Sequence, residues 1–156
     1  MSLQTNPPMH MKYNIQKLKQ NISFEEINQL TELVGWGKNY FPSPEKWERV
    51  LSASSHVAYI KIDDQLIAFG RIIEDGQMCM FYDICVHPQY QQQKIGSQLM
   101  NHLIDRIKDG NYVSIGLFVW PGNTSAKEFY QKFGFELSAA MELKNQMKPA
   151  GKKVNE

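Results

Sequence analysis

The segment spanning residues 83–99 contains residue types whose spacing suits the binding of an anion. It reads Asp-Ile-Cys-Val-His-Pro-Gln-Tyr-Gln-Gln-Gln-Lys-Ile-Gly-Ser-Gln-Leu, so an apolar strand ends near Pro88 and an amphipathic helix begins at about Ile95. Unpaired N–H groups and the positive dipole end of a helix start attract anions, and Gly96 would let a phosphate approach the backbone. The spacing predicts a phosphate cradle, with an ordinary helix N-terminus as the alternative. Neither the Walker motif nor Gly-x-Gly-x-x-Gly occurs.

The elements that precede this segment are predicted from caps, turns and periodicity. A first strand is expected over residues 13–18, and Ser23 and Glu26 have the spacing of a capping box at the start of a helix. Pro44 suits the first turn of a second helix. Three strands follow as an antiparallel meander, favoured by the Asp75-Gly76 turn, over residues 56–62, 66–73 and 78–86.

The elements that follow alternate between helix and strand. They are predicted over residues 95–107 (helix), 112–119 (strand), 126–133 (helix) and 135–143 (strand). The complete order is β-α-α-β-β-β-α-β-α-β. A meander joined to a strand–helix–strand crossover predicts the α/β class, as a mixed α+β sheet covered by helices.

Length and composition restrict the possible functions. The chain has 156 residues, with 17 Lys and Arg against 16 Asp and Glu, so a nucleic-acid partner is not expected. No apolar run reaches the ~18–20 residues of a membrane span, and no secretory signal is recognised, so a cytoplasmic location is expected. We predict one domain over residues 11–143, a polar tail over 144–156, and a disordered segment or cloning remnant over 1–10.

The two cysteines indicate neither a disulfide nor a metal site. Cys79 and Cys85 lie on one predicted strand, about 20 Å apart at ~3.3 Å per residue, which is too far for a disulfide. Neither belongs to a Cys-x-x-Cys pair. We expect both to be small buried apolar residues, and we expect no metal.

The stretch from Val86 to Leu99 resembles the acyl-coenzyme-A-binding motif Gln/Arg-x-x-Gly-x-Gly/Ala of the GNAT superfamily of N-acetyltransferases. Gln91, Ile95 and Gly96 fall on the pattern, and Lys94 occupies its first glycine position. The later Asn-x-x-Ala-x-x-Phe-Tyr and Phe-Gly-Phe segments, over residues 123–135, are similar to the family's cofactor and catalytic segment. The resemblance covers about residues 11–143. Gly70-Arg71, Glu74-Asp75-Gly76 and Tyr90-Gln91 further resemble the branch with plant plastid acetyltransferases that act on arylalkylamines and protein lysines.

The resemblance implies acetyl-CoA as cofactor and a fold in which the fourth and fifth strands splay apart. The pantetheine arm would then pair with a strand edge formed by Ile84, Cys85 and Val86. Asn123 and Tyr130 would also contact the cofactor. Backbone N–H groups would hold its pyrophosphate, from Gln91, Gln92, Gln93, Lys94, Ile95, Gly96 and Ser97. A positive φ at Lys94 would cost roughly 1 kcal/mol, although its ammonium could instead add charge near a phosphate.

The resemblance also suggests which side chains move protons. A phenol with a pKa of about 10 stays protonated at neutral pH, so Tyr130 would act as general acid toward the departing thiolate; a core tyrosine is the alternative. An alkylammonium must lose a proton before attack, and Asp83 ranks first as the base. Glu74 and Asp75 are further candidates, with simple hairpin-turn roles as the alternative.

The acceptor pocket is expected between the first two helices, where the sequence is rich in aromatic residues. Trp36, Tyr40 and Trp47 would attract a cationic amine, unless they only pack the helices. The sequence thus predicts an acetyl-CoA-dependent N-acetyltransferase acting on a primary amine, and near-neutral charge favours a small one. Alternatives are a protein lysine or N-terminal acetyltransferase and a non-catalytic acyl-CoA-binding domain. A homodimer is compatible with the sequence.

Overall fold

The computed structural model describes residues 21–141 of the chain, in two compact units that are treated separately below. The first unit ends at Phe118 and the second begins at Val119. The strand predicted over residues 13–18, the segment 1–10 and the tail 144–156 lie outside the described residues. The single-domain boundaries 11–143 therefore stay a prediction.

The first unit is built on a four-stranded mixed sheet with the order β1-β2-β3-β4. Strands β1 (His56–Ile62), β2 (Gln65–Glu74) and β3 (Met78–Val86) pair antiparallel, and β4 (Ser114–Leu117) runs parallel to β3. The crossover from β3 to β4 passes through α3 (Ile95–Ile107). The predicted meander and crossover are therefore confirmed, and so is the mixed α/β class.

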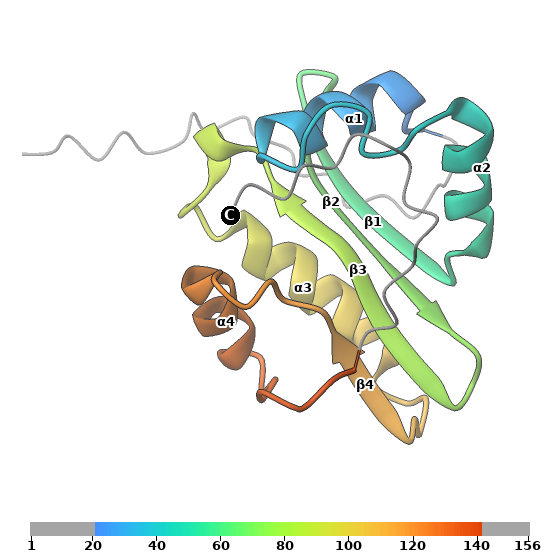
Figure 1. The fold of residues 1–156 in the computed structure, drawn as a ribbon, viewed down its shortest axis with the longest axis vertical. Coiled ribbons are helices and arrows are strands. Elements are labelled where there is room, and N and C mark those ends of the chain that lie inside the picture. The colour runs from blue at the N-terminus through green and yellow to red at the C-terminus, as the bar shows by residue number, and fades with distance from the viewer. Residues whose placement is uncertain (1–20, 142–156) are drawn as a thin grey trace, which may run out of the picture. The chain divides into compact units, whose positions relative to one another are not determined.

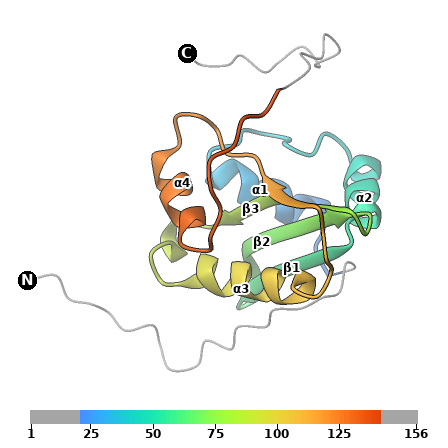
Figure 2. The same cartoon turned by 90° about the horizontal axis from the view of Figure 1, so that it is seen from below.

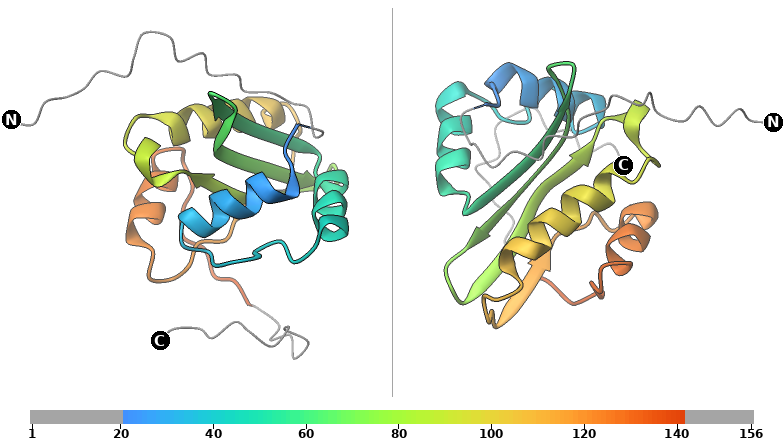
Figure 3. Two further views of the ribbon diagram at one scale, coloured as in Figure 1. Left: turned by 90° about the horizontal axis from the view of Figure 1, so that it is seen from above. Right: turned by 180° about the vertical axis from the view of Figure 1, so that it is seen from behind.

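Helices cover both faces of this sheet. Helices α1 (Phe24–Leu33) and α2 (Pro44–Ala53) lie on one face, and α3 lies on the other (Figures 1 and 2). The view from behind shows α3 running across the sheet on the face away from α1 and α2 (Figure 3). Ser43 caps α2 by accepting from the Lys46 N–H, and Pro44 occupies the first turn as expected.

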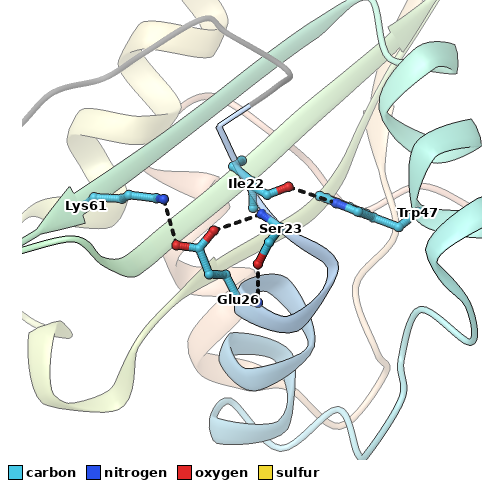
Figure 4. A network of polar contacts seen from close by, with 5 residues as sticks. All are labelled: Ile22, Ser23, Glu26, Trp47 and Lys61. Atoms are coloured by element: carbon cyan, nitrogen blue, oxygen red, sulfur yellow. Dashed lines mark hydrogen bonds and ion pairs between the residues drawn. The ribbon is translucent and has the colours of Figure 1, made fainter.

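The start of α1 is fixed by a network of polar contacts (Figure 4). Ser23 and Glu26 form the predicted capping box, and Lys61 of β1 donates to Glu26 Oε1 at 2.6 Å. Burial alone would raise the pKa of Glu26, but the hydrogen bonds from Lys61 and Ser23 outweigh it and lower that pKa. Trp47 Nε1 of α2 donates to the Ile22 carbonyl at 3.1 Å. One turn of α1 is thereby tied to both the sheet and α2.

Glycine at position 70 allows α3 to pack close to the centre of the sheet. A Cβ atom there would lie 2.6 Å from Ile84 Cδ1 and 3.0 Å from Leu103 Cδ1. Both Leu99 and Leu103 of α3 are fully buried. On the opposite face, the core is formed by side chains that include Leu30, Trp47 and Phe69.

The second unit contains α4 (Thr124–Gln131), with Asn123 as its N-cap. Rings pack along its end, with centroids 5.2 Å apart for Phe129 and Phe133. Residues 135–141 carry no regular secondary structure, although a strand was expected over 135–143. A strand requires a hydrogen-bonded neighbour, and in the described part of the chain nothing pairs with these residues.

We predict that Leu103→Ala will lower the free energy of unfolding by about 2–5 kcal/mol, because it removes a fully buried side chain and leaves a cavity between α3 and the sheet. Leu33→Ala is the matched control, since Leu33 is 45% exposed on α1 and its truncation should have little effect. Urea unfolding of both variants measures the difference. If both variants lost the same free energy of unfolding, the packing of α3 against the sheet would not contribute to stability as described.

Candidate functional site

The edge of β3 becomes open where β4 ends. Pairing of β3 with β4 stops at Phe81↔Leu117, whereas pairing with β2 continues to Val86↔Ala68. The His87 N–H donates to the Ile67 carbonyl at 2.7 Å, so by alternation the backbone groups of Val86 point away from β2. Gln91 Nε2 donates to the Val86 carbonyl from that side, at 3.0 Å. The end of β3 thus presents backbone groups that an extended ligand could pair with.

This alternation separates the three predicted edge residues. Cys85 lies directly opposite Phe69, and its buried side chain belongs to the core on the α1–α2 face. The Ile84 side chain lies over Gly70, on the α3 face. Like Val86, Ile84 is therefore expected to turn its backbone groups outward, whereas those of Cys85 face β2. Burial, and then the charge of Asp83, raises the pKa of the Cys85 thiol, which stays protonated.

The start of α3 exposes backbone donors beside this edge. A 3-10 turn (Pro88–Tyr90) leads into exposed residues 91–94, and α3 begins at Ile95, whose side chain is buried. The first N–H groups of a helix have no partner within it, and Lys94 makes no capping hydrogen bond through its side chain. Within the predicted cradle over residues 91–97, the Gln91 N–H donates to the Pro88 carbonyl at 3.4 Å, and the first turn of α3 offers its N–H groups and the positive end of the helix dipole.

Left-handed backbone shapes this turn. Lys94 has φ 63° and ψ 10°, and Gln92 has φ 61°. This conformation favours glycine, which accounts for the glycine that the GNAT motif carries at the position of Lys94. The strain expected at Lys94 is present in the structure, at roughly 1 kcal/mol for a residue of this kind.

Asp83 occupies a β-bulge at the point where β3 leaves β4. The register between β2 and β3 shifts between Phe69 and Arg71, and Asp83 has a φ of 55°. Arg71 Nε donates to Asp83 Oδ2 at 2.6 Å, with the two side chains only 10% and 6% exposed. Tyr40 Oη donates to Asp83 Oδ1 at 2.8 Å. Both carboxylate oxygens therefore accept hydrogen bonds, one of them from a buried cation.

Further contacts hold Arg71 in place. Its Nη1 donates to Ser54 Oγ at the end of α2, at 3.5 Å, and its guanidinium lies 4.9 Å from the centroid of the Tyr82 ring. Sequence reasoning assigned no role to Arg71 or Ser54. The available signal was a lone arginine inside the apolar run 66–73, since arginine is almost never fully buried unless it is paired.

The predicted acceptor residues form one series of aromatic contacts but differ in exposure. Ring centroids lie 5.0 Å apart for Trp36 and Tyr40, 4.9 Å for Tyr40 and Phe41, and 4.7 Å for Phe41 and Trp47. Trp47 is 3% exposed and bonded to Ile22, so it lies in the core. Trp36 and Tyr40 are half-buried and remain the candidates for ligand contact. Burial, and then the Asp83 charge, raises the pKa of Tyr40, which keeps its proton.

The other carboxylates considered as bases have local roles in the hairpin turn. Glu74 Oε2 accepts from the Gly76 N–H at 2.8 Å, and Asp75 Oδ1 accepts from the Met78 N–H at 2.7 Å. The backbone hydrogen bonds that Asp75 accepts lower the pKa of its carboxyl group. Both residues therefore stabilise the turn between β2 and β3.

The second unit carries the two remaining predicted site residues. Asn123 is the N-cap of α4, and its Oδ1 accepts from the Ala126 N–H at 3.0 Å. The NH2 group of the Asn123 side chain is a hydrogen-bond donor. Tyr130 is half-buried, with its ring 5.2 Å from that of Phe129 and 6.0 Å from that of Phe135. A partly accessible phenol of this kind is compatible with the acid role.

Comparison with known proteins decides the family. The sequence pattern of the acetyltransferase (GNAT) family matches residues 21–135. This chain belongs to the GNAT acetyltransferase family. A solved structure of a probable acetyltransferase from meticillin-resistant Staphylococcus aureus has a TM-score of 0.72 and 26% identity, covering 86% of this GNAT chain and 100% of the other. The resemblance carried by Gln91, Gly96 and the segment after Asn123 is therefore confirmed at the level of the family.

Two curated relatives extend this comparison. The uncharacterized N-acetyltransferase ycf52 of Porphyra purpurea is 30% identical over 119 residues, covering 74% of this GNAT chain and 66% of the relative. The ribosomal protein bS18-alanine N-acetyltransferase of Salmonella typhimurium is 27% identical over 112 residues, covering 70% of each protein. The chain thus spans about two thirds of the length of the ycf52 relative.

Two features are absent from residues 21–141, the part of the chain that the structure describes. Over that range no helix has the length and apolarity required to cross a membrane. Within the same range there is no cluster of three or more side chains suited to hold a metal ion.

We predict that Lys94→Gly will raise the free energy of unfolding by a few tenths to about 1 kcal/mol. Glycine adopts the left-handed conformation without strain, although its greater freedom in the unfolded chain offsets part of the gain. Gln91→Gly is the matched control, because Gln91 has an ordinary φ of −68° and should only be destabilised by glycine. Denaturant unfolding without ligand compares the two, and a loss of stability in Lys94→Gly would contradict the strain.

Proposed function

We propose that this chain is an acetyl-CoA-dependent N-acetyltransferase that transfers the acetyl group to a primary amine by direct attack. The observation that carries the proposal is the open end of β3 directly before the exposed start of α3, in a chain of the GNAT family. Bound acetyl-CoA would supply an acetyl thioester. The residues present fit it, because an extended amide-containing arm pairs with outward backbone groups and a pyrophosphate suits helix N–H donors.

Different groups of the chain would bind the ligand and transfer the proton. The outward backbone groups of Ile84 and the N–H of Val86 would hold the pantetheine arm, since the Val86 carbonyl accepts from Gln91 Nε2. The N–H groups of residues 92–97 would hold the pyrophosphate, since that of Gln91 donates to the Pro88 carbonyl. By the family resemblance, the phenol of Tyr130 would donate its proton to the sulfur that leaves when the amine nitrogen takes the acetyl carbon. A positioned acid of this kind contributes about 10²–10⁴-fold to a rate. Asn123 would offer its amide to the same ligand.

We do not assign the proton of the incoming amine to Asp83, although the sequence ranks it first. Protonation of Asp83 would break its bond with Arg71 Nε or with Tyr40 Oη, and would leave a buried guanidinium without its counter-ion. Uncompensated charges in such positions cost about 3–5 kcal/mol. The amine therefore loses its proton to water in this proposal.

For the acceptor, the half-buried rings of Trp36 and Tyr40 favour a small amine with an apolar or aromatic body. The ion pair beneath them is internally neutral, so it offers no net negative field to a polycation. A protein N-terminus or lysine is the second candidate, because the name of the Salmonella relative assigns it an alanine of a ribosomal protein as acceptor.

The first test is cofactor binding and turnover by the full chain. Acetyl-CoA at about 100 times its Kd should stabilise the folded protein by about 2.7 kcal/mol, measured as a rise in Tm. A panel of arylalkylamines, polyamines and peptides, scored by free-thiol release, should then show release that depends on the acceptor. An unchanged Tm would refute the binding of acetyl-CoA. Thiol release that does not depend on the acceptor would favour the non-catalytic alternative.

Tyr130→Phe should lower kcat about 100-fold or more while leaving the Kd for acetyl-CoA within about twofold, because only the transferred proton is removed. Tyr112→Phe is the matched control, since Tyr112 lies in the connection between α3 and β4, away from the β3 edge. Steady-state kinetics and calorimetric titration separate the two quantities. Unchanged turnover in Tyr130→Phe would exclude the acid role.

A further inference from the structure

The bulge at Asp83 divides β3 into two parts with different roles. Before it, Phe81 pairs with both Ile72 of β2 and Leu117 of β4. After it, Cys85 and Val86 pair with β2, and no other strand within residues 21–141 pairs with them. Bulges bend a strand and end its pairing, so this one sets the direction of the edge that follows. Whatever fixes the bulge also fixes that edge.

The bulge requires backbone that is unfavourable for the residue present. Asp83 has a φ of 55°, which is less strained for aspartate than for most residues but is still uncommon within a strand. The register places Arg71 opposite Tyr82, and the extra residue of the bulge follows directly. Arg71 contacts both of these β3 residues, the ring of Tyr82 at 4.9 Å and the carboxylate of Asp83 at 2.6 Å. One side chain therefore spans the bulge.

We propose that the buried Arg71–Asp83 ion pair is a positioning device, which locks the β3 bulge and thereby holds the outward backbone groups of Ile84 and Val86 where the acyl-CoA arm binds. Arg71 and Asp83 are thus positioning residues. The role of the edge in this inference rests on the proposed function, whereas the locking of the bulge does not.

Three segments of the chain contribute contacts to the pair. Arg71 comes from β2, Tyr40 approaches from the α1–α2 connection, and Ser54 contacts Arg71 from the end of α2. Ser54 is itself fixed by donating to the Val50 carbonyl at 2.7 Å. Both charged side chains are at least nine-tenths buried, so solvent screens their attraction little.

The chain supplies a comparison in a second, less buried ion pair, which joins β1 to α1. Lys61 and Glu26 also form an ion pair at 2.6 Å, and the register of β1 and β2 is irregular between Ile60 and Lys61. This second pair lies on β1, which is separated from β3 by β2. Its removal should alter stability without altering the β3 edge.

The test compares Arg71→Met, Asp83→Asn and the double variant with Lys61→Met. Asparagine tolerates left-handed backbone, so Asp83→Asn removes the charge and keeps the conformation accessible. The double variant leaves no unpaired buried charge and keeps the chain folded if a single variant is not. Two quantities are measured: the Kd for coenzyme A by calorimetry, and the exchange rate of the His87 amide, which bonds to Ile67, by NMR without ligand.

We expect each variant of the pair, and equally the double variant, to weaken coenzyme A binding about tenfold and to speed His87 exchange by a similar factor, as for a coupling of about 1.4 kcal/mol. Lys61→Met should change neither. Wild-type affinity and exchange in the double variant would overturn the proposal. So would an Asp83→Asn variant that loses kcat with unchanged Kd and exchange, which would indicate a base.

Failure of this inference is distinguishable from failure of the proposed function. If the wild-type chain does not bind coenzyme A, the proposed function fails and His87 exchange still decides whether the pair locks the bulge. If the wild type binds and the variants bind equally well with unchanged exchange, only the positioning role is overturned.

Discussion

The ion pair between Arg71 and Asp83 is the interaction on which the arrangement of the first unit depends. Removing two charges from water costs several kcal/mol each, and only close geometry with additional hydrogen bonds compensates for it. Here the compensation comes from Tyr40, Ser54 and the ring of Tyr82, which belong to three different parts of the chain. Satisfying one buried carboxylate therefore fixes the α1–α2 connection and the end of α2 against the middle of the sheet.

The same constraint explains how an almost neutral chain can present a site for a highly charged ligand. The formal net charge is +1, so the composition has no large excess of basic residues that would attract an anionic ligand. Donors would instead be supplied by the backbone, at the open end of β3 and at the start of α3, which follows the left-handed turn at Lys94. Strain at the turn and the bulge accompanies this arrangement, as is common at functional sites.

Local signals predicted most elements of the first unit, because caps and turns are satisfied by residues near in sequence. Ser23 and Glu26 are three positions apart, and the structure shows both bonds of their capping box. The meander and the start of α3 at Ile95 were predicted from turn residues and helical spacing. The strand expected over 135–143 was not found in its described part, since strand formation depends on a neighbour that periodicity does not supply.

The sequence by itself determined the family, the order of the elements from α1 to α4 and the start of α3, because each follows from motifs, caps and periodicity among residues near in sequence. Only the tertiary structure decided the environment of Asp83. Its partners are 12 and 43 residues away, and the bulge that carries it arises from pairing between strands. A carboxylate in a sequence has no fixed role until its neighbours in space are known, since these decide whether it accepts a proton or holds a cation.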